Sequence, residues 1–244
     1  CSTLVNRPGN VVSHEGCVPW IDRAIKLVAP HAGQITLRGD TDFTLTGELD
    51  RWDEQGVKFI FGMDAHPKVV NLAEALPEQG WKPLERLPRY EIATAPRRKP
   101  ERVKESIVRF KGYENKVLFG EDIAEIDYQP LKCSRSYRLI IVRKNISVQK
   151  GEQVLFDEIR YFLYITNRGD YAPEQIVTLA NGRCSQENVI EQLKNGVNAM
   201  RMPVDDLLSN WAYMVMTSLA WNLKAWFGLL LPNGQRGVDL IRME

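Results

Sequence analysis

Residues 34–63 read QITLRGDTDFTLTGELDRWDEQGVKFIFGM, and this stretch decides the predicted fold. A short β-branched run at Gln34–Leu37 predicts a strand that ends in Arg38-Gly39-Asp40. An amphipathic helical pattern then starts near Leu45 and stops at Gly56, because glycine commonly ends a helix. Val57–Met63 is apolar on both faces, which is typical of a strand buried in a parallel sheet.

The flanking sequence extends this alternation of strands and helices. Trp20–Val28 and Lys68–Ala75 have apolar residues at helical spacing. The resulting order predicts an α/β layer. Beyond it, runs rich in Val, Ile, Tyr and Phe predict antiparallel strands at Ser106–Phe110, Lys116–Phe119, Ala124–Tyr128, Tyr137–Val142 and Tyr161–Ile165. The sequence from Pro173 to about Leu231 is predicted to be helical.

The charge of the chain is nearly balanced overall but unevenly distributed. The 244 residues contain 32 Lys and Arg against 31 Asp and Glu. Residues 82–150 alone contain 17 basic and nine acidic residues, a surplus of +8, which leaves −7 for the rest. Such a local surplus predicts a surface that faces a polyanion, and a solvated basic face is the alternative.

One apolar stretch has the length of a membrane span. It is Trp211–Leu231, but Asn222 and Lys224 lie well inside it. A lysine at the centre of a bilayer costs about 2.5–3.5 kcal/mol on insertion scales. We therefore expect a buried helix of a soluble domain and no membrane partner. The four cysteines form no CxxC pair, which favours a reducing cytoplasm.

Asp40 is the first candidate for chemistry. It lies just beyond the end of a predicted buried strand, where α/β sheets place their ligands. Asp42 follows two residues later and is a second candidate carboxylate, which can converge with Asp40 if the chain turns there. The alternative is that one of these aspartates merely caps a helix.

A second group of charged residues follows a helical pattern late in the chain. Arg183, Glu187 and Lys194 are separated by steps of four and seven, which return to one face of an α-helix. A solvated ladder of ion pairs is the ordinary explanation of such a stripe. Glu187 together with Asp40 favours a functional explanation, because divalent cations bind carboxylate oxygens from separate elements. The basic residues Arg183 and Lys194 on either side of Glu187 would suit phosphate groups.

The whole pattern resembles a known family. The segments LVNRPGN, LRGDTDF, YFLYITN, NGRCSQENVIEQLKNGVNAMR and SNWAYMVMTSLAWNLKAW are similar to those of bacterial insertion-sequence DDE transposases of group 1. The resemblance places Asp40 on the second catalytic Asp and Glu187 on the catalytic Glu, both metal ligands. It places Arg183 and Lys194 on the basic pair of the Arg…Glu…Lys signature.

This resemblance implies a fold and a division of the chain. The expected fold is α/β, with a ribonuclease-H-like core and a mostly antiparallel β insertion before the last catalytic helix. Residues 1–81 are then the first part of the core, truncated at its N-terminus. Residues 82–166 are the basic insertion, and residues 167–244 complete the core with the helices that carry Glu187.

The resemblance also implies chemistry and partners. The expected reaction is cleavage and transfer of DNA strands by two-metal phosphoryl transfer, with Mg²⁺ as the cofactor and Mn²⁺ as a substitute. The expected partners are double-stranded DNA, as element ends and target, and a second copy of the chain in a homodimer. The expected location is the bacterial cytoplasm, at the nucleoid. From the basic surplus we add five DNA-contacting side chains: Arg97, Arg98, Lys99, Arg143 and Lys144.

Two departures from the family pattern are visible. Ala180 occupies the position three residues before Arg183 where the wider class has a tyrosine. The family's first catalytic Asp lies on an early strand, and Glu15 and Asp22, the earliest acidic residues here, have no strand before them. We therefore expect a C-terminal fragment of a transposase that does not cleave DNA by itself, and its status as an enzyme stays open.

Two other functions fit parts of the sequence. Asp40-Thr41-Asp42 followed by Phe43-Thr44 matches the nucleophile motif of haloacid-dehalogenase-like phosphohydrolases, and Tyr161–Thr166 resembles their second motif. However, the Asp205-Asp206 pair precedes a helical stretch where that family needs the end of a strand. The third hypothesis is a remnant of a transposase that binds DNA without catalysis.

Overall fold

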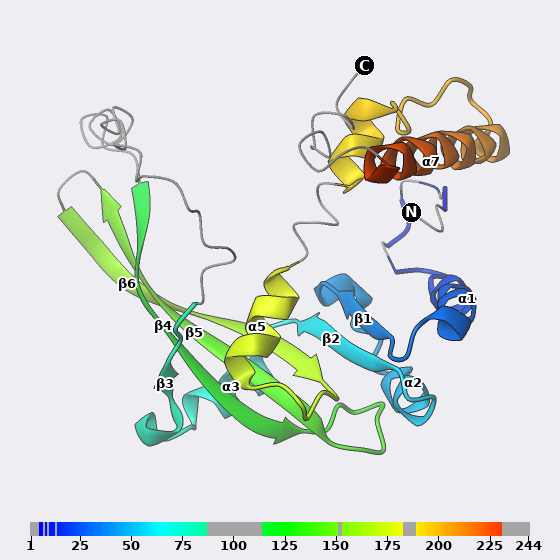
Figure 1. Ribbon diagram of the computed structural model, residues 1–244. Helices are drawn as coiled ribbons and strands as arrows, with labels where there is room; N and C mark the ends of the chain where they lie inside the picture. Colours follow the sequence, from blue (N-terminus) through cyan, green and yellow to red (C-terminus); the bar gives the residue numbers. More distant parts are fainter. Residues whose placement is uncertain are drawn as a thin grey trace. The chain divides into compact units, whose positions relative to one another are not determined.

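The computed structural model describes residues 5–6, 8, 10–12, 14–86, 114–150, 153–182 and 189–230. They fall into two compact units, one formed by residues 36–181 and the other by residues 1–35 together with 182–244. The first unit contains a six-stranded sheet, shown in Figure 1. Its strands are β1 (Thr36–Gly39), β2 (Lys58–Met63), β3 (Lys82–Pro83), β4 (Glu114–Tyr128), β5 (Tyr137–Lys150) and β6 (Gln153–Thr166).

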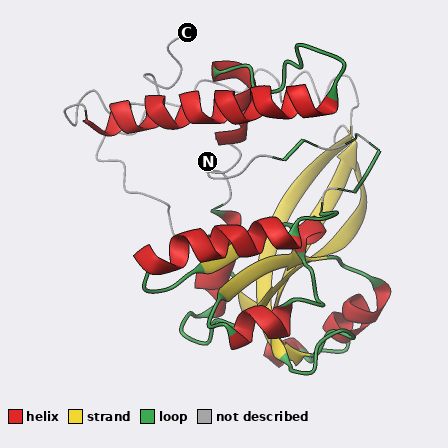
Figure 2. Ribbon diagram, turned by 90° about the vertical axis from the view of Figure 1, so that its right-hand side faces the viewer, coloured by secondary structure: helices red, strands yellow, loops and turns green. Residues whose placement is uncertain are grey.

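The sheet combines one parallel pair with an antiparallel meander. The strand order is β1-β2-β6-β5-β4-β3, so the last long strand of the meander pairs with β2. β1 and β2 are parallel, with Gly39 beside Phe61, whereas β2 and β6 are antiparallel, with Ile60 beside Thr166. The α/β prediction is therefore confirmed, as a mixed sheet that is compatible with a ribonuclease-H-like fold. Figure 2 shows the long strands side by side in a strongly twisted sheet.

One face of the sheet is covered by helix α5 (Pro173–Asn181). Its residues Ile176, Val177 and Ala180 are buried in one cluster with strand residues that alternate along β2, β4 and β5. These strand residues are Ile60, Ile123, Ile140 and Val142. Burial of each large aliphatic side chain contributes roughly 1.5–3 kcal/mol. We call this side of the sheet the α5 face.

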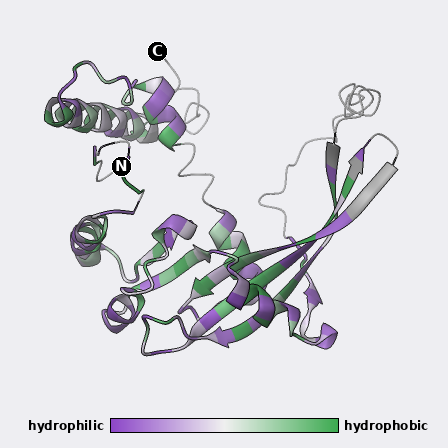
Figure 3. Cartoon of the chain, turned by 180° about the vertical axis from the view of Figure 1, so that it is seen from behind, coloured by the Kyte–Doolittle hydropathy of each residue, from purple (hydrophilic) through white to green (hydrophobic). Residues whose placement is uncertain are grey.

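The opposite face holds the aromatic core, beside helix α2 (Leu49–Glu54). Phe59 and Phe61 alternate with Ile60 along β2 and therefore point away from α5. Trp52 of α2 is fully buried and lies 6.0 Å from Phe61 between ring centroids. Helix α3 (Pro67–Glu74) buries Val69 and Ala73. Figure 3 shows hydrophobic colouring along the strands between these layers.

Strand β4 differs from the prediction. Lys116–Phe119 and Ala124–Tyr128 were expected as two strands with a turn between them, but they form one strand. A bulge between Leu118 and Gly120 inserts Phe119 into β4, and the pairing with β5 continues through it. A bulge interrupts the alternation of side chains without ending the strand, which explains the error. Ser106–Phe110 lies outside the described residues.

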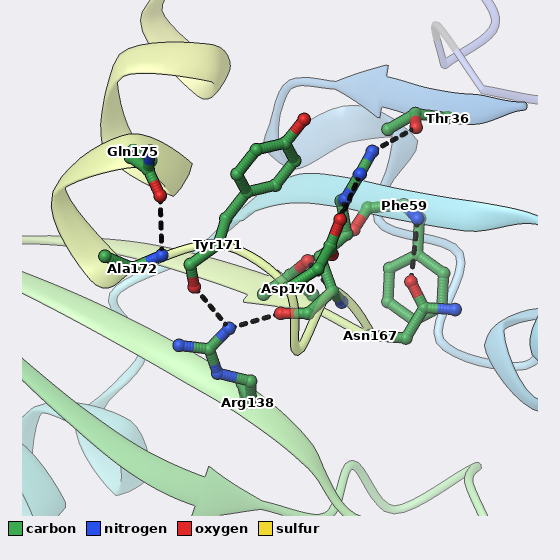
Figure 4. Close-up of polar contacts among 10 residues, drawn as sticks. Thr36, Phe59, Arg138, Asn167, Asp170, Tyr171, Ala172 and Gln175 are labelled. Atoms are coloured by element: carbon green, nitrogen blue, oxygen red, sulfur yellow. Dashed lines mark hydrogen bonds and ion pairs between the residues drawn. The ribbon is translucent and has the colours of Figure 1, made fainter. Parts of the chain in front are cut away.

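The turn after β6 binds the end of the meander to the beginning of the sheet. The Thr166 hydroxyl donates to the Phe59 carbonyl at 2.6 Å. The Asn167 side chain accepts from the Phe59 N–H at 2.9 Å and donates to the Val57 carbonyl at 3.0 Å. In Figure 4 the Arg138 guanidinium points at this turn, and it donates to the carbonyl of Tyr171 at 2.9 Å and to that of Arg168.

Arg168 holds β1 against the same turn. Its side chain is 8% exposed and donates to the Asp170 carboxylate at 2.6 and 3.0 Å. It also donates to the Thr36 hydroxyl at 2.8 Å and lies 4.2 Å above the Tyr171 ring. A buried charge needs a paired partner, so Asp170 is required for the Arg168 guanidinium to occupy this position.

The loop between β4 and β5 is anchored on α2 through Asp50. This carboxylate accepts hydrogen bonds from Ser134 N at 2.6 Å, Ser134 Oγ at 2.7 Å and Tyr137 Oη at 2.6 Å. Burial acts to raise the pKa of Asp50, but these hydrogen bonds outweigh it and leave the pKa below its ordinary value. The Cys133 thiol donates to the Thr46 carbonyl at 3.0 Å beside it.

The second unit is helical in the residues that the structure describes. It contains α1 (Val18–Val28), the short η1 (Ala29–His31), the π-helical η4 (Gln192–Gly196) and α7 (Leu207–Leu230). The rings of Trp20 and Trp211 meet edge to face at 5.8 Å. Trp221 Nε1 donates to Gln192 Oε1 at 3.0 Å, which fixes α7 to η4.

Several boundaries differ from the sequence prediction. The helix expected from about Leu45 begins at Leu49, because the chain from Thr41 to Gly47 forms a 3₁₀ turn and bends. Gly56 follows that helix with a φ of +75°, as expected for a glycine stop. The helical prediction from Pro173 onward is interrupted at 198–206, where the described chain is not helical.

Helix α7 covers the stretch that had the length of a membrane span. Among the described residues, no helix is both long and apolar enough to cross a bilayer. The expected buried helix is buried along one side: within the described residues Met214 and Ser218 are buried, whereas Val215, Leu219 and Leu223 are exposed. The division into residues 1–81, 82–166 and 167–244 stays a prediction, although β3 to β6 belong to the same sheet as β1 and β2.

Replacing Asp170 with asparagine should destabilise the protein and change its response to acid. The hydrogen bond from Arg168 lowers the pKa of Asp170 from 3.8 to about 2. A depressed carboxyl pKa gives stability that is fully present above the ordinary value and is lost as pH falls towards about 2. The parent should therefore lose more stability than Asp170→Asn between pH 4 and pH 2, measured by urea unfolding.

Asp157→Asn on the exposed part of β6 is the matched control for this experiment. It should unfold like the parent at neutral pH. Identical pH dependence for Asp170→Asn and the parent would contradict the assignment of a stabilising ion pair to Arg168 and Asp170.

Candidate functional site

Asp40 lies immediately after β1, at the end where the parallel strands β1 and β2 both have their carboxyl ends. Its backbone is still extended, with φ −83° and ψ −172°, and the 3₁₀ turn η2 (Thr41–Phe43) follows. The Asp40 side chain makes no capping hydrogen bond to η2, so Asp40 does not serve as its cap. The Asp40 side chain is exposed. This is the position at which open α/β sheets bind ligands.

Two glycines and a threonine hold the turn after Asp40 against β2. A Cβ at Gly39 would lie 2.9 Å from both Phe43 Cβ and Phe61 Cδ1, so a side chain there forces a shift of the packed rings. A Cβ at Gly62 would lie 3.3 Å from Thr41 N. The Thr44 hydroxyl donates to the Asp40 carbonyl at 3.3 Å and to the Gly62 carbonyl. The Thr44 hydroxyl and the close packing at Gly39 and Gly62 therefore hold the backbone of this turn.

Asp40 points to the α5 face. Arg38 lies beside Ile60, whose side chain packs against α5, and Arg38 Nη1 donates to the Leu179 carbonyl of α5 at 2.9 Å. Because the backbone stays extended through Asp40, residues 38 and 40 share this face. The chain turns only after Asp40, so Asp42 belongs to η2 and is exposed.

The C-terminal end of α5 lies over the same region of the sheet. Tyr164, which pairs with Gly62 across β6 and β2, places its hydroxyl 3.5 Å from Asn181 Oδ1. Leu179 is held by Arg38 as described above. Both contacts fasten the last turn of α5 beside the strand end that carries Asp40. Helix α5 therefore ends on this side of the sheet.

The late charged residues are only partly described. Arg183 and Glu187 lie outside the described residues. Lys194 is exposed and belongs to the π-helical η4. The predicted stripe assumed a regular α-helix, but a π-helical turn contains more residues than an α-helical one. Because Glu187 lies outside the described residues, the predicted stripe and the role of Lys194 stay predictions.

Arg143 is embedded in a network of carboxylates on the sheet. Its guanidinium donates to Glu78 at 2.6 and 3.0 Å and to Asp122 at 3.0 and 3.1 Å. It also lies 4.5 Å above the Trp81 ring, and its side chain is 16% exposed. The hydrogen bond from Arg143 lowers the pKa of Glu78. A phosphate would have to compete with two carboxylates for this side chain.

Lys144 points to the other face and is paired as well. Its Nζ lies 3.1 Å from Glu121, which also accepts from Arg86 at 2.5 and 2.7 Å. The ammonium is 4.5 Å from the Phe162 ring, and the side chain is 25% exposed. Arg97, Arg98 and Lys99 lie outside the described residues. DNA contacts by these five basic residues stay predictions.

The described residues supply limited metal-binding chemistry. Among them, no group of three or more His, Cys, Asp or Glu side chains is placed to hold a metal ion. Asp40 offers a carboxylate, the donor that Mg²⁺ prefers, in an exposed position. It therefore fits one ligand of a site whose second proposed ligand, Glu187, lies outside the described residues.

The phosphohydrolase alternative gains no support from this geometry. Thr166, the expected hydroxyl of its second motif, is fully buried and donates to the Phe59 carbonyl. Asp206 lies before α7, where it accepts from Ser209 N at 2.7 Å, and this contact with Ser209 lowers the pKa of Asp206. The acidic pair thus precedes a helix, as the sequence indicated.

Sequence reasoning missed Arg38, Thr44 and Gly62 as parts of this site. Arg38 and Thr44 flank Asp40 in the quoted LRGDTDF stretch and its continuation, so their proximity was available from the sequence. The register that sets Gly62 beside the turn, and the contact of Arg38 with α5, depend on residues far apart in the chain. Only the structure provides them.

Comparison with known proteins identifies the family. A search of curated proteins found none that matches the chain. The model of the family described as transposase DDE domain group 1 matches residues 2–237. Because this match spans nearly the whole chain, the chain belongs to the group 1 family of transposase DDE domains.

Proposed function

We propose that this protein takes part in metal-dependent cleavage and transfer of DNA strands, with Asp40 and Glu187 as carboxylate ligands of the catalytic metal site. The family is one of transposases, whose substrate is DNA and whose members generally use divalent metal ions. The observation that carries the proposal is the position of Asp40: exposed, at the carboxyl end of a parallel strand, with its backbone fixed by other groups.

The end of α5 supports the pairing of Asp40 with Glu187. Arg38 and Tyr164 hold the last turn of α5 beside the Asp40 strand end. Glu187 follows Gly182 by five residues. Five residues span about 8 Å as a helix and at most about 17 Å when extended. We propose that Glu187, on so short a connection, lies in the neighbourhood of Asp40.

The reaction follows from the ligand chemistry. Bound Mg²⁺ ions would activate a water or a DNA 3′-hydroxyl and stabilise the leaving oxygen. The carboxylates of Asp40 and Glu187 would hold that charge in place, with Mn²⁺ as a substitute. Arg183 and Lys194 would neutralise phosphates beside the site, because guanidinium and ammonium groups pair with phosphate oxygens. Two copies of the chain would act together on the element ends.

The basic segment 82–166 is the proposed contact with the DNA flanking the site. Its surplus through residue 150 is +8, and the rest of the chain is negative. This proposal depends mainly on Arg97, Arg98 and Lys99, because Arg143 and Lys144 already have carboxylate partners. Binding through Arg143 or Lys144 would require a rearrangement of those ion pairs.

Iron-directed cleavage of the protein backbone tests the metal site. Fe²⁺ replaces Mg²⁺ and, with ascorbate and peroxide, cuts the chain near the bound metal. The parent should be cut near residue 40 and near residue 187. Asp40→Asn should lose both cuts, because one ligand of a shared site is gone. Mass spectrometry of the fragments gives the result.

Asp157→Asn, an exposed aspartate on β6, should retain both cuts as the control. Cutting near residue 40 that survives in Asp40→Asn would refute the assignment. No cutting at either position in the parent would favour the non-catalytic, DNA-binding alternative.

Neutralising Arg97, Arg98 and Lys99 together to glutamine should reduce the salt dependence of DNA binding. Each phosphate contact on duplex DNA contributes about −0.9 to the log–log salt slope, so the slope should flatten by up to about three. Affinity should fall similarly on all sequences, because phosphate contacts do not read bases. Fluorescence anisotropy with a labelled duplex at several salt concentrations measures both effects.

The control removes three exposed charges elsewhere, by changing Arg23, Lys26 and Lys68 to glutamine. It should keep the slope of the parent. If the two triple variants have equal slopes, the proposed DNA surface on residues 82–166 is wrong.

A further inference from the structure

Arg38 is the residue of the Asp40 strand that carries a positive charge towards the α5 face. It is exposed, and Asp40 lies two residues further along the same extended chain. Side chains two residues apart on one face of a strand are separated by about 6.6 Å along it. A single phosphate group can face both positions at this spacing.

Among the residues that the structure describes, no carboxylate pairs with Arg38, in contrast to the other arginines of the same unit. Within the described part of residues 36–181, each of the other arginines forms an ion pair with Asp or Glu. Arg38 makes no such pair among the described residues and instead donates to the neutral carbonyl of Leu179 at 2.9 Å. Its guanidinium is therefore cationic, exposed and on the same strand face as the carboxylate of Asp40, which we propose as a metal ligand.

The contact with Leu179 orients this guanidinium. Leu179 lies in the last turn of α5, where backbone carbonyls lack partners within the helix. Nη1 is engaged there. A guanidinium has several N–H donors in a rigid, planar arrangement, so fixing one nitrogen leaves others in a defined direction. Planar donors of this kind suit the oxygens of a phosphate.

We infer that Arg38 binds a phosphate oxygen of the DNA strand that lies at Asp40. This inference rests on the proposed function of the Asp40 site and adds a phosphate-binding residue to it. Arg38 would hold the strand by a charge-assisted hydrogen bond, while the Leu179 carbonyl keeps the guanidinium in place. The alternative is that Arg38 serves only to cap α5.

Two substitutions separate these roles. Arg38→Gln keeps an N–H donor for the Leu179 carbonyl but removes the charge, and Arg38→Lys keeps the charge. Binding of a labelled 30-base-pair duplex is measured by fluorescence anisotropy at several salt concentrations. We expect Arg38→Gln to flatten the log–log salt slope by about 0.9, the contribution of one phosphate. Arg38→Lys and the control Arg51→Gln, whose residue pairs with Glu48, should keep the parent slope.

A slope for Arg38→Gln equal to that of the parent would overturn the inference and leave the proposed function standing. A parent that does not bind the duplex would refute the proposed function, and the inference with it. A chemical measurement on the parent covers the case in which Arg38→Gln fails to fold. DNA should protect Arg38 from phenylglyoxal, and unchanged modification of Arg38 in the presence of bound DNA would also overturn the inference.

Discussion

The pairing of β6 with β2 is the constraint on which the larger unit depends. It joins a strand that ends at Thr166 to one that begins at Lys58, so two parts of the chain about a hundred residues apart become neighbours. The turn after β6 makes this strand pairing specific. Thr166 and Asn167 bind the backbone of Phe59, and Arg168 binds Thr36 while Asp170 balances its charge. A slip of one residue would exchange the two faces of β6 and break the contacts of Thr166, Asn167 and Arg168 with β1 and β2.

The position of the candidate site follows from the pairing of β6 with β2. With one side of β2 fixed by β6, β1 adds in parallel at the other side, and the carboxyl ends of β1 and β2 lie at the same end of the sheet. The meander also sets the start of α5, which crosses the sheet and ends near Arg38 and Tyr164. Asp40 is thus placed by long-range contacts made elsewhere. Its carboxylate does not cap η2, and the Thr44 hydroxyl and Gly62 hold its backbone.

The sequence predicted those features that depend on local patterns. The buried strand at Val57–Met63, the glycine stop at Gly56 and the helix near Lys68–Ala75 all follow from short-range periodicity. The family, and Asp40 as a candidate, could also be proposed from quoted motifs. The bulge at Phe119 could not be predicted, because it reverses the alternation of side chains within an unbroken strand. The local pattern therefore predicted a turn at this position.

The ion pairs of Arg143 and Lys144 could not be predicted from the sequence either. Their acidic partners are Glu78, Asp122 and Glu121, and only the register of β4 with β5 and the position of η3 (Glu78–Gly80) bring them together. A basic surplus counted along the chain therefore overstates the charge that is available to DNA. Arg38 is the reverse case. Arg38 contributes one positive charge to a part of the sequence whose net charge is negative. In the structure, however, this charge has no carboxylate partner among the described residues.

The most direct test of the account is whether Asp40 and Glu187 belong to one metal site. Mn²⁺ binding is measured by calorimetry for the parent, Asp40→Asn, Glu187→Gln and the double variant. Ligands of a shared site are coupled, so the double variant should lose little more binding free energy than either single variant. Losses that simply add, or Mn²⁺ binding that is unchanged in Asp40→Asn, would contradict the shared site.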